Sequence, residues 1–125
     1  MQVGDAFYPI TPVIMEHLWI VVTAPASGNG KIVMVNVTSH RAGSDEACVL
    51  QDGDHPFIQH QSTIAYQHAQ IADAAALDMF VAKGYLQMRA RVTGGLLHRI
   101  QNGALASTFT PRGVQTLIRR ELGMD

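Results

Sequence analysis

The sequence has a single cysteine, few charged residues and no long apolar run. Cys48 has no second cysteine with which to form an internal disulfide, and its neighbours Ala47, Val49 and Leu50 predict a buried thiol. Charged residues are 15% of the chain, which is too few for a disordered tail. No apolar run approaches the roughly 18 residues that span a bilayer, and the first ten residues lack the basic and apolar regions of a signal peptide. We therefore expect a cytoplasmic protein without a membrane partner.

The motifs that usually mark a cofactor or a metal are also missing. The sequence has no glycine-rich phosphate loop, no Gly-x-Ser-x-Gly nucleophile motif, and no His-Glu-x-x-His or paired-cysteine spacing. We therefore expect neither a cofactor nor a metal centre. With 125 residues and a hydrophobic content of 47%, the chain fits one compact domain, residues 1–125.

The first part of the chain has the composition of β-strands. Two β-branched, apolar runs flank the turn Gly28-Asn29-Gly30, which predicts that they form a hairpin. Strands are expected at 4–10, 17–23, 31–38, 47–50 and 62–71. Short strands separated by Gly and Pro turns favour a small curled β-barrel over residues 1–72.

The pattern changes to helix after the last of these strands. Asp73 is placed to cap a helix over 74–83, because an aspartate side chain accepts hydrogen bonds from the first helical amides. The core face of this helix would be formed by Leu77, Phe80 and Val81. Segment 85–92 alternates between apolar and mostly basic or polar residues, which predicts a strand, with a continued helix as the alternative.

Two more helices complete the expected fold. Thr93 is placed to cap the first, which would stop at Asn102-Gly103. Thr110 is placed to cap the second, with Pro111 at its first helical position. The expected class is therefore α+β, a small curled β-barrel with a C-terminal helical extension over 73–125.

The net charge of −1 conceals an uneven distribution of charge. Residues 1–72 hold two basic and six acidic side chains, whereas residues 73–125 hold seven basic and four acidic ones. The two halves can pair internally, or the basic half can leave a face for phosphates. The overall balance does not by itself indicate nucleic-acid binding.

The stretch 50–71 is rich in side chains that ligate metals. These side chains are Asp52, Asp54, His55, His60 and His68. On one continuous strand, His60 and His68 would be roughly 26 Å apart at about 3.3 Å per residue, too far for one ion. Asp52-Gly53-Asp54 is typical of a tight turn. Only His55 is then a candidate, either as a general acid or base or as a turn histidine bonded to its neighbours.

The segment Val37-Thr38-Ser39-His40-Arg41 is the second candidate site. Its hydroxyls end an expected strand and its imidazole and guanidinium begin a loop, a position from which functional side chains often project. Hydroxyl, imidazole and guanidinium are together the groups that bind a phosphodiester and stabilise its transition state. The alternative is a polar loop that merely leaves the sheet.

The first 72 residues resemble the MazF/PemK-type toxins in the order and spacing of four motifs. These are Gly4-Asp5 before an apolar strand, the run Trp19-Ile20-Val21-Val22, Val37-Thr38-Ser39 at a strand end, and Ser62 at the start of a later strand. The resemblance implies an SH3-like barrel of bacterial origin that acts as a homodimer. It further implies metal-independent cleavage of single-stranded RNA and an antitoxin-like protein as partner.

The chain departs from the family pattern where the family has its catalytic arginine, before the second strand. His17 occupies that place, and the loop 10–16 replaces a loop that contains glutamine and glycine. The resemblance implies Thr38 as the catalytic hydroxyl, with His17, Arg41 or His55 replacing the arginine. The function expected is a toxin-like, metal-independent endoribonuclease. The alternative is a catalytically inactive barrel that acts as a protein-binding or regulatory module.

Overall fold

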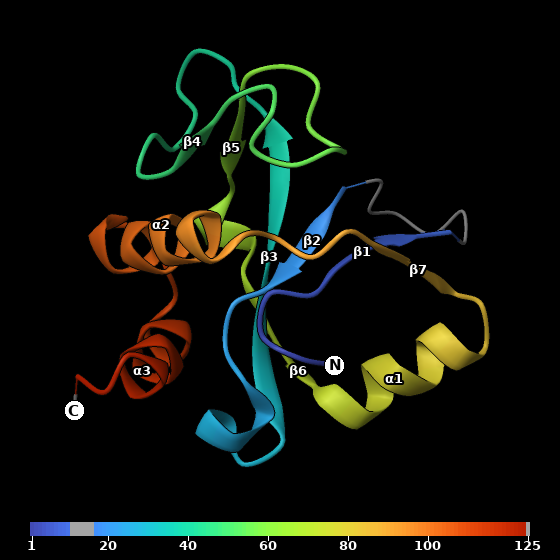
Figure 1. The fold of residues 1–125 in the computed structure, drawn as a ribbon. Coiled ribbons are helices and arrows are strands. Elements are labelled where there is room, and N and C mark those ends of the chain that lie inside the picture. The colour runs from blue at the N-terminus through green and yellow to red at the C-terminus, as the bar shows by residue number, and fades with distance from the viewer. Residues whose placement is uncertain (11–16, 125) are drawn as a thin grey trace.

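A computed structural model describes residues 1–10 and 17–124 of the chain, so most of the 10–16 loop lies outside the described residues. The fold is α+β: an antiparallel sheet of seven described strands with three α-helices packed against it (Figure 1). The elements in chain order are β1 (Ala6–Pro9), β2 (Trp19–Val21), η1 (Pro25–Gly28), β3 (Lys31–Ser39), β4 (Val49–Leu50), β5 (Ser62–Ile64), η2 (Tyr66–His68), β6 (Gln70–Asp73), α1 (Ala74–Ala82), β7 (Leu86–Arg89), α2 (Gly94–Ala106) and α3 (Arg112–Glu121).

The long strand β3 organises the sheet. The strands follow the order β4-β5-β3-β2-β1-β7, and β6 pairs with β3 in addition. One edge of β3 pairs with β2, in the register Ile20↔Val35. Its other edge pairs first with β6 and then, nearer its C-terminal end, with β5, where Thr38 lies opposite Thr63. The expected hairpin between the strands on either side of Gly28-Asn29-Gly30 is therefore present.

A small curled β-barrel was expected, and the sheet of described strands is not closed. The path of described strands begins at β4 and ends at β7, and these two strands do not pair with each other. β4 has only two residues, and β7 pairs with β1 alone among the described strands. Helix α2 supplies Leu96, Ile100 and Ala104 to the core, so a helix covers the apolar face that a closed barrel would enclose.

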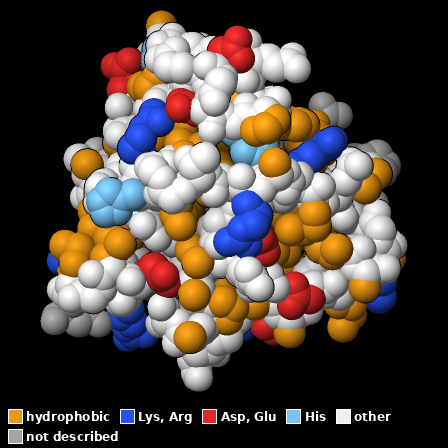
Figure 2. All heavy atoms as spheres, viewed as in Figure 1, with side chains coloured by type: hydrophobic (Ala, Val, Ile, Leu, Met, Phe, Trp, Pro, Cys, Tyr) orange, Lys and Arg blue, Asp and Glu red, His pale blue; other side chains and the backbone are white. Residues whose placement is uncertain are grey.

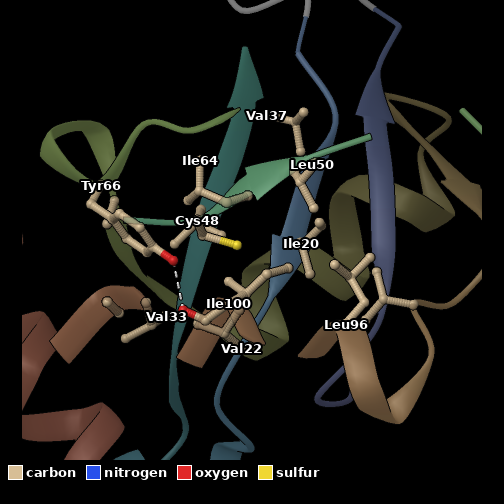
Figure 3. Close-up of a cluster of buried hydrophobic side chains, with 14 of the residues drawn as sticks. Ile20, Val22, Val33, Val37, Cys48, Leu50, Ile64, Tyr66, Leu96 and Ile100 are labelled. Carbon is tan, nitrogen blue, oxygen red and sulfur yellow. Dashed lines mark hydrogen bonds between the residues drawn. The ribbon is translucent and has the colours of Figure 1, made fainter. Parts of the chain in front are cut away.

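The alternation of side chains along the strands creates two cores. On β3, Val33, Val35 and Val37 enter the larger core together with residues of α2 and α3 (Figure 3). The opposite face forms a smaller core beneath α1. Its buried members are Phe7, Trp19, Val21, Ile32, Ala74 and Leu77. Both faces of the sheet are therefore covered, which explains why β2 and the middle of β3 are mostly apolar.

Two of the three helix starts and one helix end illustrate how the sequence compares with the structure. The Asp73 side chain accepts a hydrogen bond from the Ala75 amide at 3.2 Å, and Thr93 caps α2 through the Leu96 amide at 3.1 Å. The expected stop at Asn102-Gly103 is wrong, because α2 continues to Ala106. Glycine is needed there for packing rather than for ending the helix, because the Tyr66 hydroxyl, Cys48 and the Ala47 carbonyl approach Gly103 closely.

Three other expectations differ from the structure. The expected cap of α3 by the Thr110 side chain is not observed, because Pro111 occupies the N-cap position and no side chain accepts a hydrogen bond there. The Thr110 hydroxyl has no hydrogen-bond partner among the described atoms. Phe80 was expected in the core but is 40% exposed. The expected strand over 62–71 is divided, because the 3₁₀ turn η2 separates β5 from β6. No described helix is long and apolar enough to cross a membrane.

Candidate functional site

A pocket of about 240 Å³ lies at the C-terminal end of β3. Three segments that are distant in the sequence form it: the residues before β2, the end of β3 with its following loop, and the loop before β5. Its lining residues are His17, Leu18, Val37, Thr38, Ser39, Arg41, Phe57, Ile58, Gln59, His60 and Ser62. Three of the four side chains predicted as catalytic, His17, Thr38 and Arg41, therefore share one pocket.

The strand register explains why these segments meet. Ser39 on β3 lies opposite Ser62 on β5, and the ladder continues through a hydrogen bond from the His40 amide to the Gln61 carbonyl at 3.2 Å. On the other edge of β3, the Val37 amide donates to the Leu18 carbonyl at 2.9 Å. Each backbone contact holds one polar segment beside the end of β3, so the pocket is fixed by sheet geometry.

The polar side chains of the pocket are only partly bonded to one another. Ser39 Oγ and His60 Nε2 are 2.9 Å apart, which fixes the position of the His60 ring. In contrast, the side chains of His17, Thr38 and Arg41 have no hydrogen-bond or ion-pair partner within the ranges that the structure describes. They are therefore available for a ligand.

The charge of the pocket favours an anion. Two imidazoles and one guanidinium line it, and none of its described lining residues is acidic. The nearest histidine outside it along the chain, His40, is instead paired with Glu46 at 2.9 Å. Guanidinium, imidazole and hydroxyl groups, in a pocket whose described lining has no carboxylate, suit a phosphate group, to which all of them can donate hydrogen bonds.

His55, the fourth predicted side chain, lies apart from the other three. It is 3% exposed and is not among the pocket lining residues. Its Nε2–H donates to the Ala90 carbonyl at 2.6 Å, and its Nδ1 accepts from the Phe57 amide at 3.0 Å. One donor and one acceptor together require the neutral ring. His55 thus ties the loop before β5 to the chain that follows β7, and the structure gives it a positioning role.

His60 lines the pocket, although it was considered in the sequence only as a metal ligand and was not proposed as a catalytic residue. The separation of His60 from His68 was reckoned along one continuous strand, but η2 interrupts that strand. The missing information was the register of β5 on the end of β3, which brings the residues before Ser62 beside Ser39. Among the described residues, no three His, Cys, Asp or Glu side chains cluster in a way that could hold a metal ion.

A second hollow, of about 330 Å³, lies between β4 and α2. Cys48, Arg99 and Gly103 are among its lining residues. Burial raises the pKa of the Cys48 thiol, an effect that the nearby Arg99 only partly opposes. Arg99 is itself bonded to Asp54 at 3.0 Å and to the Val49 carbonyl at 2.9 Å. This hollow therefore contains neither a nucleophilic thiolate nor a free cation.

Comparisons with known proteins assign no family to this fold and pocket. No protein-family model matches the chain, and no curated protein matches it. The class of the protein is thus given by its own geometry: an α+β fold with a polar, anion-type pocket at the end of its central strand.

Proposed function

We propose that the protein is a metal-independent endoribonuclease that cleaves single-stranded RNA in the pocket at the end of β3. The observation that supports this most directly is the convergence of two imidazoles, one guanidinium and hydroxyl groups from three separate segments. An RNA phosphodiester is an anion, its cleavage requires proton transfer at two oxygens, and its transition state gains negative charge on the phosphate. The described lining supplies groups for each of these requirements.

The proposed reaction is an internal transfer of the phosphate. A neutral imidazole accepts the proton of the ribose 2′-hydroxyl while that oxygen forms a bond to the adjacent phosphorus. The bond from phosphorus to the 5′-oxygen of the next nucleotide breaks, and a protonated imidazole donates its proton to that oxygen. The products are a 2′,3′-cyclic phosphate and a 5′-hydroxyl. His17 and His60 share the roles of base and acid, because they enter the pocket from different segments.

Thr38 and Arg41 bind the phosphate in this proposal. The Thr38 hydroxyl and the Arg41 guanidinium have no partner among the described residues, so both can donate to non-bridging oxygens. Arg41 is exposed, and its charge faces a pocket without described carboxylates. Ser39 holds the His60 ring by its 2.9 Å contact and therefore acts as a positioning residue.

We extend the proposal to a toxin-like role of the MazF/PemK type. Thr38 lies near the C-terminal end of β3 and lines the pocket. This position supports the toxin-like role, since the resemblance places the catalytic hydroxyl on a threonine at a strand end. The successive pairing of one edge of β3 with β6 and β5 supports a curled, barrel-like description of the sheet. A homodimeric assembly, a bacterial origin, a cytoplasmic location and an antitoxin-like protein partner belong to the same proposal.

Cleavage of mixed-sequence single-stranded RNA in the presence of EDTA tests this function. We expect fragments that end in 2′,3′-cyclic phosphate, detected by mass spectrometry. Thr38→Ala should lower the rate about 10²- to 10³-fold, as loss of one transition-state donor does. His60→Asn should lower it about 10²- to 10⁴-fold, because proton transfer is lost.

Thr116→Ala is the matched control for these variants. Thr116 is an exposed threonine on α3 whose hydroxyl donates to the Arg112 carbonyl at 3.1 Å, far from any role in the pocket. Its rate should equal that of the wild type. Equal rates for the wild type, Thr38→Ala and His60→Asn would identify the activity as a contaminant, and an absence of cleavage by the wild type would reject the proposal.

A second candidate function, a catalytically inactive binding module, is favoured by the outer edge of the sheet. β7 pairs only with β1 among the described strands, and large apolar side chains are exposed along β7 and the adjoining α1. They are Met79, Phe80, Tyr85 and Met88. An unpaired edge with exposed apolar groups is a typical place for a partner strand to add. Failure of cleavage together with capture of an antitoxin-like protein would favour this function.

A further inference from the structure

An exposed aromatic side chain stands at the rim of the pocket. Phe57 lines the pocket and is 38% exposed. Its ring centroid is 5.1 Å from that of Tyr8, and the two rings are tilted by 42°. The guanidinium carbon of Arg89 lies over the Phe57 ring, 5.1 Å from its centroid. Three flat side chains from β1, β7 and the loop before β5 therefore form one layered group, which we call the Phe57 platform.

The Phe57 platform is fixed by the backbone on both sides. The Phe57 amide donates to His55 Nδ1 at 3.0 Å, and the next amide, that of Ile58, donates to the His55 carbonyl at 2.9 Å. Ile58 is 4% exposed and is part of the larger core. His55 in turn donates to the Ala90 carbonyl at 2.6 Å, next to Arg89. A large exposed ring held this firmly loses little entropy when a ligand covers it.

Arg89 is exposed, and its guanidinium group lies over the Phe57 ring. Within the described ranges it makes no ion pair with any carboxylate, in contrast to Arg91 and Arg99. A guanidinium on an aromatic ring presents its outer plane to solvent, and both aromatic rings and guanidinium planes stack on unpaired nucleobases. The platform thus has the shape and chemistry of a base-stacking surface directly beside a phosphate-type pocket.

We propose that the Phe57 platform binds the nucleobase next to the phosphate held by Thr38 and Arg41. This inference rests on the proposed function, since it assumes that the pocket receives a nucleic-acid phosphate. The subsite accepts any of the bases, because every base has a π-face, and it requires an unpaired strand whose bases are free to stack.

The distribution of charge makes such a subsite necessary for useful affinity. On the face shown in Figure 2, basic and acidic side chains are interspersed, without a broad basic patch. The formal net charge of the whole chain is −1. Proteins that bind nucleic acid mainly through phosphates need many cations and release many counterions. The described pocket lining holds only one arginine and two histidines, so in this proposal base stacking contributes a large part of the binding.

Equilibrium binding by fluorescence anisotropy in EDTA tests the platform. One probe is a labelled single-stranded hexanucleotide with 2′-O-methyl riboses, which cannot be cleaved by 2′-hydroxyl attack. The second probe is the same backbone with every base removed. The variants are Phe57→Leu, which keeps apolar volume without a ring, and Arg89→Lys, which keeps the charge without the plane. Phe57→Tyr keeps the ring, and Phe109→Leu removes an aromatic that is 62% exposed and outside the pocket lining.

We expect the wild type to bind the base-bearing probe more tightly than the abasic one. Phe57→Leu and Arg89→Lys should each weaken binding of the base-bearing probe roughly tenfold, as loss of one stacked base does. Neither should change binding of the abasic probe. Phe57→Tyr and Phe109→Leu should bind both probes as the wild type does.

Each other outcome overturns the inference in a recognisable way. Equal affinity of the wild type for both probes would remove the base subsite but leave the phosphate pocket and the nuclease intact. An equal loss for both probes in Phe57→Leu would show that Phe57 only shapes the pocket. Binding of neither probe by the wild type would overturn the subsite and the proposed function together.

Discussion

Two hollows of the molecule, the one between β4 and α2 and the pocket at the end of β3, differ in what their polar side chains already bind. In the hollow between β4 and α2, Arg99 is bonded to Asp54 and to a backbone carbonyl, and the Cys48 thiol is kept protonated by burial. In the pocket at the end of β3, Thr38 and Arg41 have no side-chain partner among the described residues. Arg99 in the hollow between β4 and α2 thus already has partners, whereas Thr38 and Arg41 in the pocket at the end of β3 have none among the described residues.

Whether polar side chains already have partners distinguishes a structural hollow from a candidate functional pocket better than the volume of the hollow or its residue types do. Both hollows contain an arginine, yet the one beside α2 ties a turn to a helix and the one beside β3 faces a cavity. Polar side chains that complete each other stabilise the fold, whereas side chains left incomplete need a ligand. The comparison gives three predictions on stability, in order of decreasing effect.

Gly103→Ala should have the largest effect, on the side of the α2 hollow. A Cβ at this position would overlap the Tyr66 hydroxyl and lie 2.9 Å from Cys48 Cβ. It would also disturb the 2.7 Å hydrogen bond from that hydroxyl to the Ile100 carbonyl (Figure 3). We expect the free energy of unfolding, measured by urea denaturation, to fall by about 3 kcal/mol.

Gly95→Ala is the matched control on the same helix. An added Cβ at Gly95 meets nothing within 4 Å, so alanine there should leave stability unchanged or raise it by up to about 1 kcal/mol. If Gly103→Ala were as stable as Gly95→Ala, the close packing of α2 on Tyr66 and Cys48 would be wrong.

His55→Leu should have the second largest effect, because it removes the hydrogen bonds that join the loop before β5 to the chain after β7. Leucine leaves the Phe57 amide and the Ala90 carbonyl without their partner, at a cost of about 2 kcal/mol in the free energy of unfolding. His98→Leu, at an exposed position of α2, is the control and should change stability by less than about 0.5 kcal/mol. Equal stabilities of the two variants would mean that His55 does not anchor the loop.

Asp54→Asn should have the smallest effect, and the effect should depend on pH. The hydrogen bond from Arg99 lowers the pKa of Asp54 below its ordinary value of 3.8. A lowered folded-state pKa means that the pair stabilises the protein above the ordinary value and loses this contribution as pH falls through the folded value. We expect less than about 1 kcal/mol between wild type and variant near neutral pH, since the Arg99 side chain is 47% exposed and solvent screens the pair.

Urea denaturation at several pH values measures this difference. The difference between the two stability curves should shrink as pH falls below 3.8 and vanish below the lowered pKa of folded Asp54, where the carboxyl group of the wild type is protonated in both states. A constant difference down to the lowest pH would mean that the charge of Asp54 is not what Arg99 stabilises.

Local patterns predicted the elements of the fold, and non-local contacts decided what the patterns could not. The capping side chains Asp73 and Thr93 act within their own turns, so their roles are visible in the sequence. The end of α2 was not visible, because Gly103 serves contacts with Tyr66 and Cys48, which are distant in the chain. Closure of the sheet was likewise a property of how strands and helices pack, and short apolar runs do not specify it.

The candidate site was predictable to the same extent. A strand ending in hydroxyls before an imidazole and a guanidinium drew attention to Thr38 and Arg41, and both line the pocket. His60 was missed, because only the pairing of β5 with β3 places it there. His55 was chosen for its residue type, but its surroundings use both ring nitrogens for backbone contacts. Residue types thus indicated the candidate side chains, and the register of the strands determined which of them line the pocket.

The non-local pairing of β3 also determines when the pocket appears during folding. Ser39 meets Ser62, and Val37 meets Leu18, only after the intervening loops have closed. Such closure is an entropic cost that must be met before the contacts are gained, so non-local β pairing is slow relative to helix formation. The pocket therefore assembles only after these loop closures, whereas each helix forms within its own segment. A chain cut anywhere between Leu18 and Ser62 retains its helical sequences but lacks the covalent continuity that brings the pocket together.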